Sequence, residues 1–184
     1  MPRGRFITLE GGEGAGKSTQ ATLLAERLRA TGTPVLQTRE PGGTRFAEAI
    51  RAVLIGDAAQ GVDPVAEALA HFAARADHVA RAIRPALEDG QHVVSDRFFD
   101  STFAYQAVAG GIDGPRFDAI RRAAIGDFQP DLTLVLDVPT TLGIRRARDA
   151  NRYERLGEAF HARVRAGFRG LAEAEPGRCV LIDA

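Results

Sequence analysis

A glycine-rich segment near the N-terminus combines the residue types that bind phosphate groups. Segment 9–19 reads LEGGEGAGKST and lies between a short apolar run and a stretch of helical period. Glycines let backbone N–H groups point at an anion, Lys17 can reach outer phosphates, and the Ser18 hydroxyl can ligate magnesium. A loop that only reverses the chain would not need that lysine and hydroxyl. We therefore expect a nucleoside triphosphate to contact Gly11, Gly12, Glu13, Gly14, Ala15, Gly16, Lys17, Ser18 and Thr19.

Two charged residues, Asp96 and Arg97, follow the apolar run 92–95. An isolated aspartate at the end of a strand is usually part of a surface turn. The carboxylate could also hold magnesium or orient a phosphate-binding arginine. The glycine-rich segment favours the second interpretation, because both would serve the same ligand.

The remaining candidate cations form two groups of arginines. The first group, on three different predicted elements, consists of Arg51, Arg75 and Arg97. The second group follows the fourth apolar run and consists of Arg145, Arg146, Arg148 and Arg152. A solvated basic helix face accounts for one such group but not for two. Two groups fit phosphoryl transfer between nucleotides, in which the charge of the moving group is neutralised from several sides.

These residues must be positioned by a chain that alternates short apolar runs with longer helical segments. The expected strands span residues 6–9, 35–38, 92–95, 132–136 and 179–182. The expected helices span residues 17–30, 47–54, 64–88, 117–124, 140–150 and 158–174. The alternation is typical of an α/β protein with a parallel sheet flanked by helices, which binds ligands beyond the carboxyl ends of its strands.

Length and composition narrow the class of protein. The 184 residues, 45% of them hydrophobic, fit a single domain over residues 1–184. The 24 basic and 24 acidic residues balance, which argues against a nucleic-acid polymer or an anionic membrane as partner. We find no signal-peptide core and no apolar run that could span a bilayer. Cys179 is the only cysteine, so no intrachain disulfide forms, and we expect a cytoplasmic enzyme.

Seven short segments carry a resemblance to a known family. In chain order they read LEGGEGAGKST (9–19), TREPGGT (38–44), FAAR (72–75), DRF (96–98), STFAYQ (101–106), GDFQPDLT (126–133) and RYE (152–154). Together they resemble the bacterial thymidylate kinases, which are P-loop nucleoside monophosphate kinases. The resemblance implies a three-layer P-loop NTPase fold with a five-stranded parallel sheet. It also implies ATP-dependent phosphorylation of dTMP to dTDP with Mg²⁺ as cofactor, in a homodimer.

The resemblance assigns the donor side of the site. Residues 14–18 would hold the ATP phosphates, with Ser18 and Asp96 on the magnesium ion and Arg97 bridging the donor and acceptor phosphates. Residues 145–155 would form a mobile lid that closes on the triphosphate. Arg145 of this lid would contact ATP. The catalytic residues expected in this way are Lys17, Asp96, Arg97, Arg148 and Arg152.

The acceptor nucleotide would lie opposite ATP. Arg75 would hold its base and Arg51 its phosphate. Tyr105 would crowd the 2′ position of the sugar. Thr102 and Gln106 would hydrogen-bond thymine. The acceptor-binding residues expected in this way are Glu13, Glu40, Pro41, Arg51, Phe72, Arg75, Arg97, Ser101, Thr102, Tyr105 and Gln106.

Among the departures of the sequence from the family pattern, two concern the residue that stacks on the base and the C-terminal end. The family often has an aromatic residue four positions before the helix arginine, where this chain has His71, and we expect the neighbouring Phe72 to stack on the base instead. The sequence ends at Ala184, just after the last expected strand, where relatives usually continue into another helix. We expect that helix to be absent here.

Two other functions share the phosphate-binding loop. One is a kinase for another nucleotide or for a deoxynucleoside, which would differ only in its acceptor. The other is a triphosphate-dependent switch without kinase activity. A guanine-specific switch would carry an Asn-Lys-x-Asp segment, and the sequence contains none.

Overall fold

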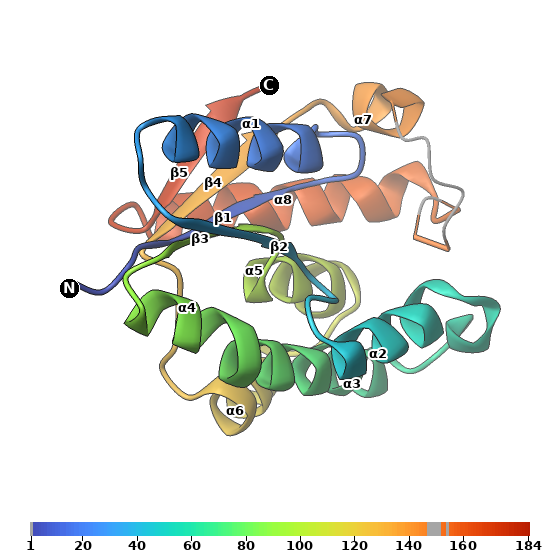
Figure 1. Cartoon of the computed structure of the whole chain (residues 1–184). Helices are drawn as coiled ribbons and strands as arrows, with labels where there is room; N and C mark the ends of the chain where they lie inside the picture. Colours follow the sequence, from blue (N-terminus) through green and yellow to red (C-terminus); the bar gives the residue numbers. More distant parts are fainter. Residues whose placement is uncertain (1, 147–151, 154) are drawn as a thin grey trace.

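A five-stranded parallel sheet forms the centre of the molecule, in the order β2-β3-β1-β4-β5 (Figure 1). The structure is a computed structural model and describes residues 2–146, 152–153 and 155–184. Its strands are β1 (Phe6–Gly11), β2 (Val35–Arg39), β3 (His92–Asp96), β4 (Leu132–Asp137) and β5 (Cys179–Asp183). All neighbours pair in parallel, so the carboxyl ends meet at one edge. The predicted α/β fold is confirmed, with each strand one or two residues longer than predicted.

Helices cover both faces of the sheet, which gives the three expected layers. In Figure 1, α1 lies on one side of the sheet and α3, α4 and α6 on the other. None of the helices in the described part of the chain has the length and apolar content to cross a membrane. The helical elements are α1 (Lys17–Ala30), α2 (Arg45–Ile55), η1 (Asp57–Ala59), α3 (Pro64–His78), η2 (Val79–Ile83), α4 (Arg84–Glu88), α5 (Phe99–Thr102), η3 (Phe103–Ala109), α6 (Gly114–Ile125), α7 (Thr140–Arg146) and α8 (Glu158–Ala174).

The long helix predicted over residues 64–88 is confirmed with one irregularity. It consists of α3, the π-helical segment η2 and α4. Pro85 lies just beyond η2 and has no N–H to donate to the preceding turn, which accounts for the change of helical geometry there. The Asp63 side chain caps the start of α3 by accepting hydrogen bonds from the N–H groups of Val65 and Ala66.

The helical segment formed by α5 and η3 is not among the helices predicted from the sequence. Its sequence has no apolar stripe of helical period, because polar residues such as Asp100 and Gln106 are buried along with the apolar ones. An element that is enclosed on nearly all sides does not show the amphipathic pattern by which a surface helix is recognised. This missed element carries much of the site described below.

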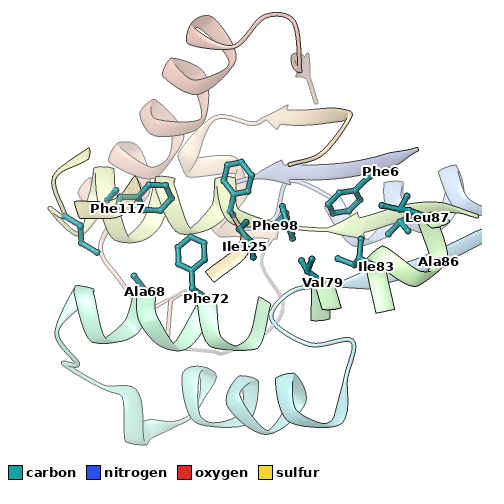
Figure 2. Packing of buried hydrophobic residues seen from close by; sticks show 14 residues of the cluster. Phe6, Ala68, Phe72, Val79, Ile83, Ala86, Leu87, Phe98, Phe117 and Ile125 are labelled. Atoms are coloured by element: carbon teal, nitrogen blue, oxygen red, sulfur yellow. The ribbon is translucent and has the colours of Figure 1, made fainter. Parts of the chain in front are cut away.

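The largest apolar cluster fills the space between the sheet and the helices α3 to α6 (Figure 2). Phe6 and Phe98 meet edge to face with 4.9 Å between their ring centroids. Phe72 and Phe117 make a similar contact at 5.7 Å. The prediction that Phe72 stacks on a bound base is wrong, because its ring is only 1% exposed and faces this core. Because an α-helix has about 3.6 residues per turn, the neighbouring His71 lies on another side of α3.

We expect Phe72→Ala to lower the free energy of unfolding by about 3–5 kcal/mol, because it leaves a cavity in a closely packed core. Urea unfolding followed by circular dichroism measures this change. The matched control is Leu23→Ala on α1, whose side chain is 52% exposed and should change the free energy by less than about 0.5 kcal/mol. A Phe72→Ala protein of unchanged stability but weaker nucleotide binding would restore the stacking role.

Candidate active site

A cavity of about 560 Å³ opens at the carboxyl ends of the strands. This is where a doubly wound parallel sheet binds its ligands. Its donor side includes Gly14, Gly16, Lys17, Ser18, Thr19 and Asp96. The cavity is also lined by every predicted acceptor-binding residue except Phe72, namely Glu13, Glu40, Pro41, Arg51, Arg75, Arg97, Ser101, Thr102, Tyr105 and Gln106. The structure therefore brings these two sequence-predicted sets into one space.

The glycine-rich segment forms a tight loop between β1 and α1. Gly14 and Gly16 have φ angles of 67° and 86°, a region that other residues rarely adopt. The Lys17 ammonium lies against this loop and donates to the carbonyl of Gly12 at 2.7 Å. Burial and the nearby Arg97 lower the pKa of Lys17 to about 8. A bound anion would oppose this shift and keep the ammonium charged.

Three predicted loop residues lie outside the large cavity. Gly11 and Gly12 line a much smaller cavity of about 20 Å³ beneath the loop, next to α8. Ala15 is buried in an apolar cluster with Leu136 and Val138. Of the predicted ATP-binding loop residues, Glu13, Gly14 and residues 16–19 thus line the large cavity.

Ser18 and Asp96 meet at the end of β3 as predicted. The Ser18 hydroxyl donates to Asp96 Oδ2 at 2.5 Å, and Asp96 Oδ1 is buried without a hydrogen-bond partner. A hydroxyl and a carboxylate with an unsatisfied oxygen are the hard ligands that Mg²⁺ accepts, and this ion retains several waters of its own. The pair therefore fits the metal, although no group of three His, Cys, Asp or Glu ligands occurs among the described residues.

Arg97 lines the cavity and contacts both the phosphate loop and α5. Its guanidinium donates to Glu13 Oε1 at 2.9 Å and to Ser101 Oγ at 3.0 Å. Burial alone would raise the pKa of Glu13, but Arg97 and Lys17 lower it to about 2. Tyr105 donates its hydroxyl to the same Glu13 oxygen at 2.8 Å. One loop carboxylate thus orients both the central arginine and the tyrosine.

The acceptor side contains a buried charge network. Arg75 Nε donates to Glu40 Oε2 at 2.6 Å, and its Nη2 donates to the carbonyl of Phe98 and to Thr102 Oγ1, both at 3.1 Å. Arg75 Nη1 is buried without a partner. A buried donor that is left unpaired is costly, so this nitrogen is suited to a ligand acceptor.

Sequence reasoning missed His78. Its side chain is fully buried, with Nδ1 2.9 Å from Glu40 Oε1 and Nε2 2.9 Å from Thr38 Oγ1. Its position three residues after Arg75 on the same helix is the one signal that could have indicated this role. His78 joins the end of β2 to the network around Arg75.

Arg51 and His71 complete the acceptor side. Arg51 Nη1 donates to the carbonyl of Pro41 at 3.0 Å, which holds it beside the loop that follows β2. His71 lines the cavity, and burial together with Arg75 lowers its pKa to about 3. The imidazole is therefore neutral at physiological pH. It occupies the place at the cavity that was expected for Phe72.

The structure separates the predicted lid arginines. Arg145 donates to the carbonyl of Thr141 at 3.2 Å and does not line the large cavity, whereas Arg146 does. Arg152 is paired with Glu67 and donates to the carbonyl of Leu54 at 2.5 Å. The structure therefore does not bring Arg152 to the phosphate loop. Arg148 lies outside the described residues.

Comparisons with known proteins agree with this geometry. The family model "Thymidylate kinase" matches residues 9–184. The thymidylate kinase of Rhizorhabdus wittichii is 54% identical, and that of Caulobacter vibrioides is 50% identical; each match covers 100% of this chain and 90% of the relative. The crystal structure of thymidylate kinase from Ehrlichia chaffeensis superposes with a TM-score of 0.82 at 38% identity, over 98% of this chain and 93% of the other. The chain belongs to the thymidylate kinase family.

Proposed function

We propose that this enzyme transfers the terminal phosphate of ATP to the 5′-phosphate of dTMP, giving dTDP, in the cytoplasm. The observation that carries the proposal is the place of Arg97, which contacts Glu13 of the phosphate loop and Ser101 of the acceptor side. One guanidinium is thus available to both phosphate groups. Phosphoryl transfer needs little covalent chemistry, so positioning and charge neutralisation account for most of the catalysis.

On the donor side, the loop amides of residues 14–18 and the Lys17 ammonium hold the triphosphate. Ser18 and Asp96 hold Mg²⁺, which when bound supplies positive charge to the phosphate oxygens. No general base is needed, because the attacking group is already a phosphate oxyanion. Arg145 and a cation from the lid, Arg148 or Arg152, would add charge to the triphosphate, and these assignments stay predictions.

On the acceptor side, the free Nη1 of Arg75 supports recognition of a base carbonyl. Thr102 and Gln106 also line the cavity. Their polar side chains would supply further hydrogen bonds to thymine. Tyr105 is fixed by its hydrogen bond to Glu13, so its ring limits the space beside the sugar. The neutral imidazole of His71 offers a flat face to the base.

We further propose that the enzyme is a homodimer joined through α2 and α3. These two helices pack side by side (Figure 1). They carry large apolar residues with exposed side chains. Phe46 is 53% exposed, Val53 56% and Leu69 52%. Exposed apolar groups gathered on adjacent helices are typical of a protein interface.

The choice of acceptor is tested with ATP, Mg²⁺ and a panel of nucleotides. We expect kcat/KM for dTMP to exceed that for dUMP by about tenfold, since the two differ by one methyl group. We expect about 1000-fold less for dCMP, because the cytosine amino group cannot accept from Arg75. Product formation is measured by chromatography. Equal or better activity with dCMP or with free thymidine would indicate a kinase for another nucleotide or for a deoxynucleoside. Hydrolysis of ATP that dTMP does not affect would indicate a triphosphate-dependent switch.

Replacement of Arg97 tests the proposed bridge. We expect Arg97→Ala to lower kcat by about 1000-fold while the dissociation constant for ATP changes little, because its charge acts mainly in the transition state. Turnover and calorimetric ATP binding measure the two effects. Arg27→Ala on the exposed side of α1 is the matched control and should keep kcat. A normal kcat in Arg97→Ala would remove this residue from the site.

The dimer is tested by adding a charge to its proposed face. We expect Leu69→Glu to yield a monomer in light scattering after size exclusion, since a carboxylate on an apolar interface is left desolvated. Leu23→Glu on α1, at the same 52% exposure, should leave the native dimer intact. A native protein that is already a monomer would overturn the proposal.

A further inference from the structure

A buried carboxylate on the central strand lies close to the proposed catalytic arginine. Glu10 follows the strand alternation of Phe6 and Thr8, so its side chain enters the layer opposite α1. Its exposure is 0%. A carboxylate in such a place is retained only with strong hydrogen bonds, and an apolar residue would usually be more stable there. Its partners therefore indicate its role.

The side-chain hydrogen bonds that the structure describes for Glu10 all go to the turn that follows Arg97. Oε1 accepts from the backbone N–H of Phe98 at 2.7 Å and from that of Ser101 at 3.3 Å. Oε2 accepts from the Ser101 hydroxyl at 2.5 Å. These donors lie at the start of α5, where the first N–H groups of a helix lack the usual carbonyl four residues before them. The N–H of Ser101 is shared between Glu10 and the carbonyl of Phe98, which lies 3.2 Å away. Glu10 thus holds the start of α5, which begins two residues after Arg97.

The backbone of Arg97 requires such support. Its φ angle is 73°, the one positive φ of a residue other than glycine among those the structure describes. A residue in this conformation is held by its surroundings. Its N–H donates to the carbonyl of Leu9 at 3.0 Å, and its carbonyl accepts from the Ser95 hydroxyl at 2.8 Å. The next backbone N–H, that of Phe98, is the one that Glu10 accepts.

Ser101 connects Glu10 to the guanidinium itself. Its hydroxyl donates to Glu10 Oε2 and accepts from Arg97 Nη1 at 3.0 Å. Because the hydroxyl proton is directed at the carboxylate, the oxygen lone pairs are left for the arginine. The hydrogen bonds from Arg97 through Ser101 to Glu10 thus hold the Arg97 guanidinium, and those from Phe98 and Ser101 hold the backbone that follows Arg97.

We propose that Glu10 is a positioning residue of the phosphoryl transfer, which acts by holding Arg97 where its guanidinium reaches both phosphates. The proposal rests on the proposed bridging role of Arg97. Burial, followed by the charge of Asp100, raises the pKa of the Glu10 carboxyl. Burial of the Glu10 carboxyl is therefore unfavourable for folding. A role in holding the active site explains its presence better than a role in stabilising the fold.

Glu10→Gln tests this role, because it keeps the shape and the acceptor for the two amides but replaces Oε2 by a donor. The Ser101 hydroxyl then loses its acceptor. We expect kcat to fall about tenfold with KM for ATP within about twofold, since a small displacement of Arg97 acts mainly in the transition state. Thr8→Val is the matched control on the same strand. Thr8 is also fully buried, and its side-chain hydroxyl bonds to Thr133 and not to the turn after Arg97, so kcat should be kept.

A double-mutant cycle with Arg97→Ala distinguishes positioning from general support. We expect Glu10→Gln to cause no further loss of kcat when Arg97 is already absent, and Ser101→Ala to show the same dependence. Slow variants are followed by transfer of radiolabelled phosphate. An equal loss in both backgrounds, or an unchanged kcat in Glu10→Gln and Ser101→Ala alone, would overturn the proposal. A normal kcat in Arg97→Ala would instead refute the bridge on which it rests. If Glu10→Gln fails to fold, Ser101→Ala alone decides between these outcomes.

Discussion

The ion pair between Arg97 and Glu13 is the interaction on which the arrangement of the site depends. It joins the loop after β3 to the phosphate loop after β1, with 2.9 Å between Nη2 and Oε1. Both side chains are largely withdrawn from water, which strengthens their attraction and lowers the pKa of Glu13 to about 2. Because this carboxylate stays ionised, it holds the guanidinium and the Tyr105 hydroxyl in fixed positions beside each other.

Two other buried ion pairs hold elements that carry residues of the site. Arg75 pairs with Glu40 on the acceptor side, and Arg178 pairs with Asp100 through hydrogen bonds of 2.7 and 3.0 Å. Asp100 belongs to α5, so this second pair holds the turn that carries Ser101. Buried ion pairs contribute little net stability because of their desolvation cost. Their concentration around α5 and α3 is better understood as a means of holding exact side-chain positions for two nucleotides.

The fold and much of the site could be predicted because their signals are local. Apolar runs closed by glycine or charged residues located all five strands, and the helices α1 and α8 have the predicted bounds. In a parallel sheet the ends of these strands must meet at one edge. Motifs that lie just after the strands were therefore certain to become neighbours. This is why nearly all of the expected acceptor-binding residues line one cavity.

Residues whose role depends on orientation could not be predicted in this way. A step of one residue along α3 turns Phe72 into the core and His71 toward the cavity, and composition alone favoured the aromatic ring for the base. The sequence position of Arg152 does not show whether its side chain contacts the phosphate loop or α3. The structure pairs it with Glu67 of α3. Glu10 and His78 look like ordinary members of a strand and a helix, because their partners lie far away in the chain.

The sequence by itself determined which residues could carry the chemistry and in which order the strands and helices follow. Glycine punctuation, hydrophobic period and strand ends are properties of neighbouring residues, so they can be recognised without a fold. Only the tertiary structure decided which side chains face the nucleotides and which support them. That decision depends on burial and on hydrogen bonds between distant residues, such as those from Phe98 and Ser101 to Glu10. These contacts exist only once the sheet has brought the strand ends together.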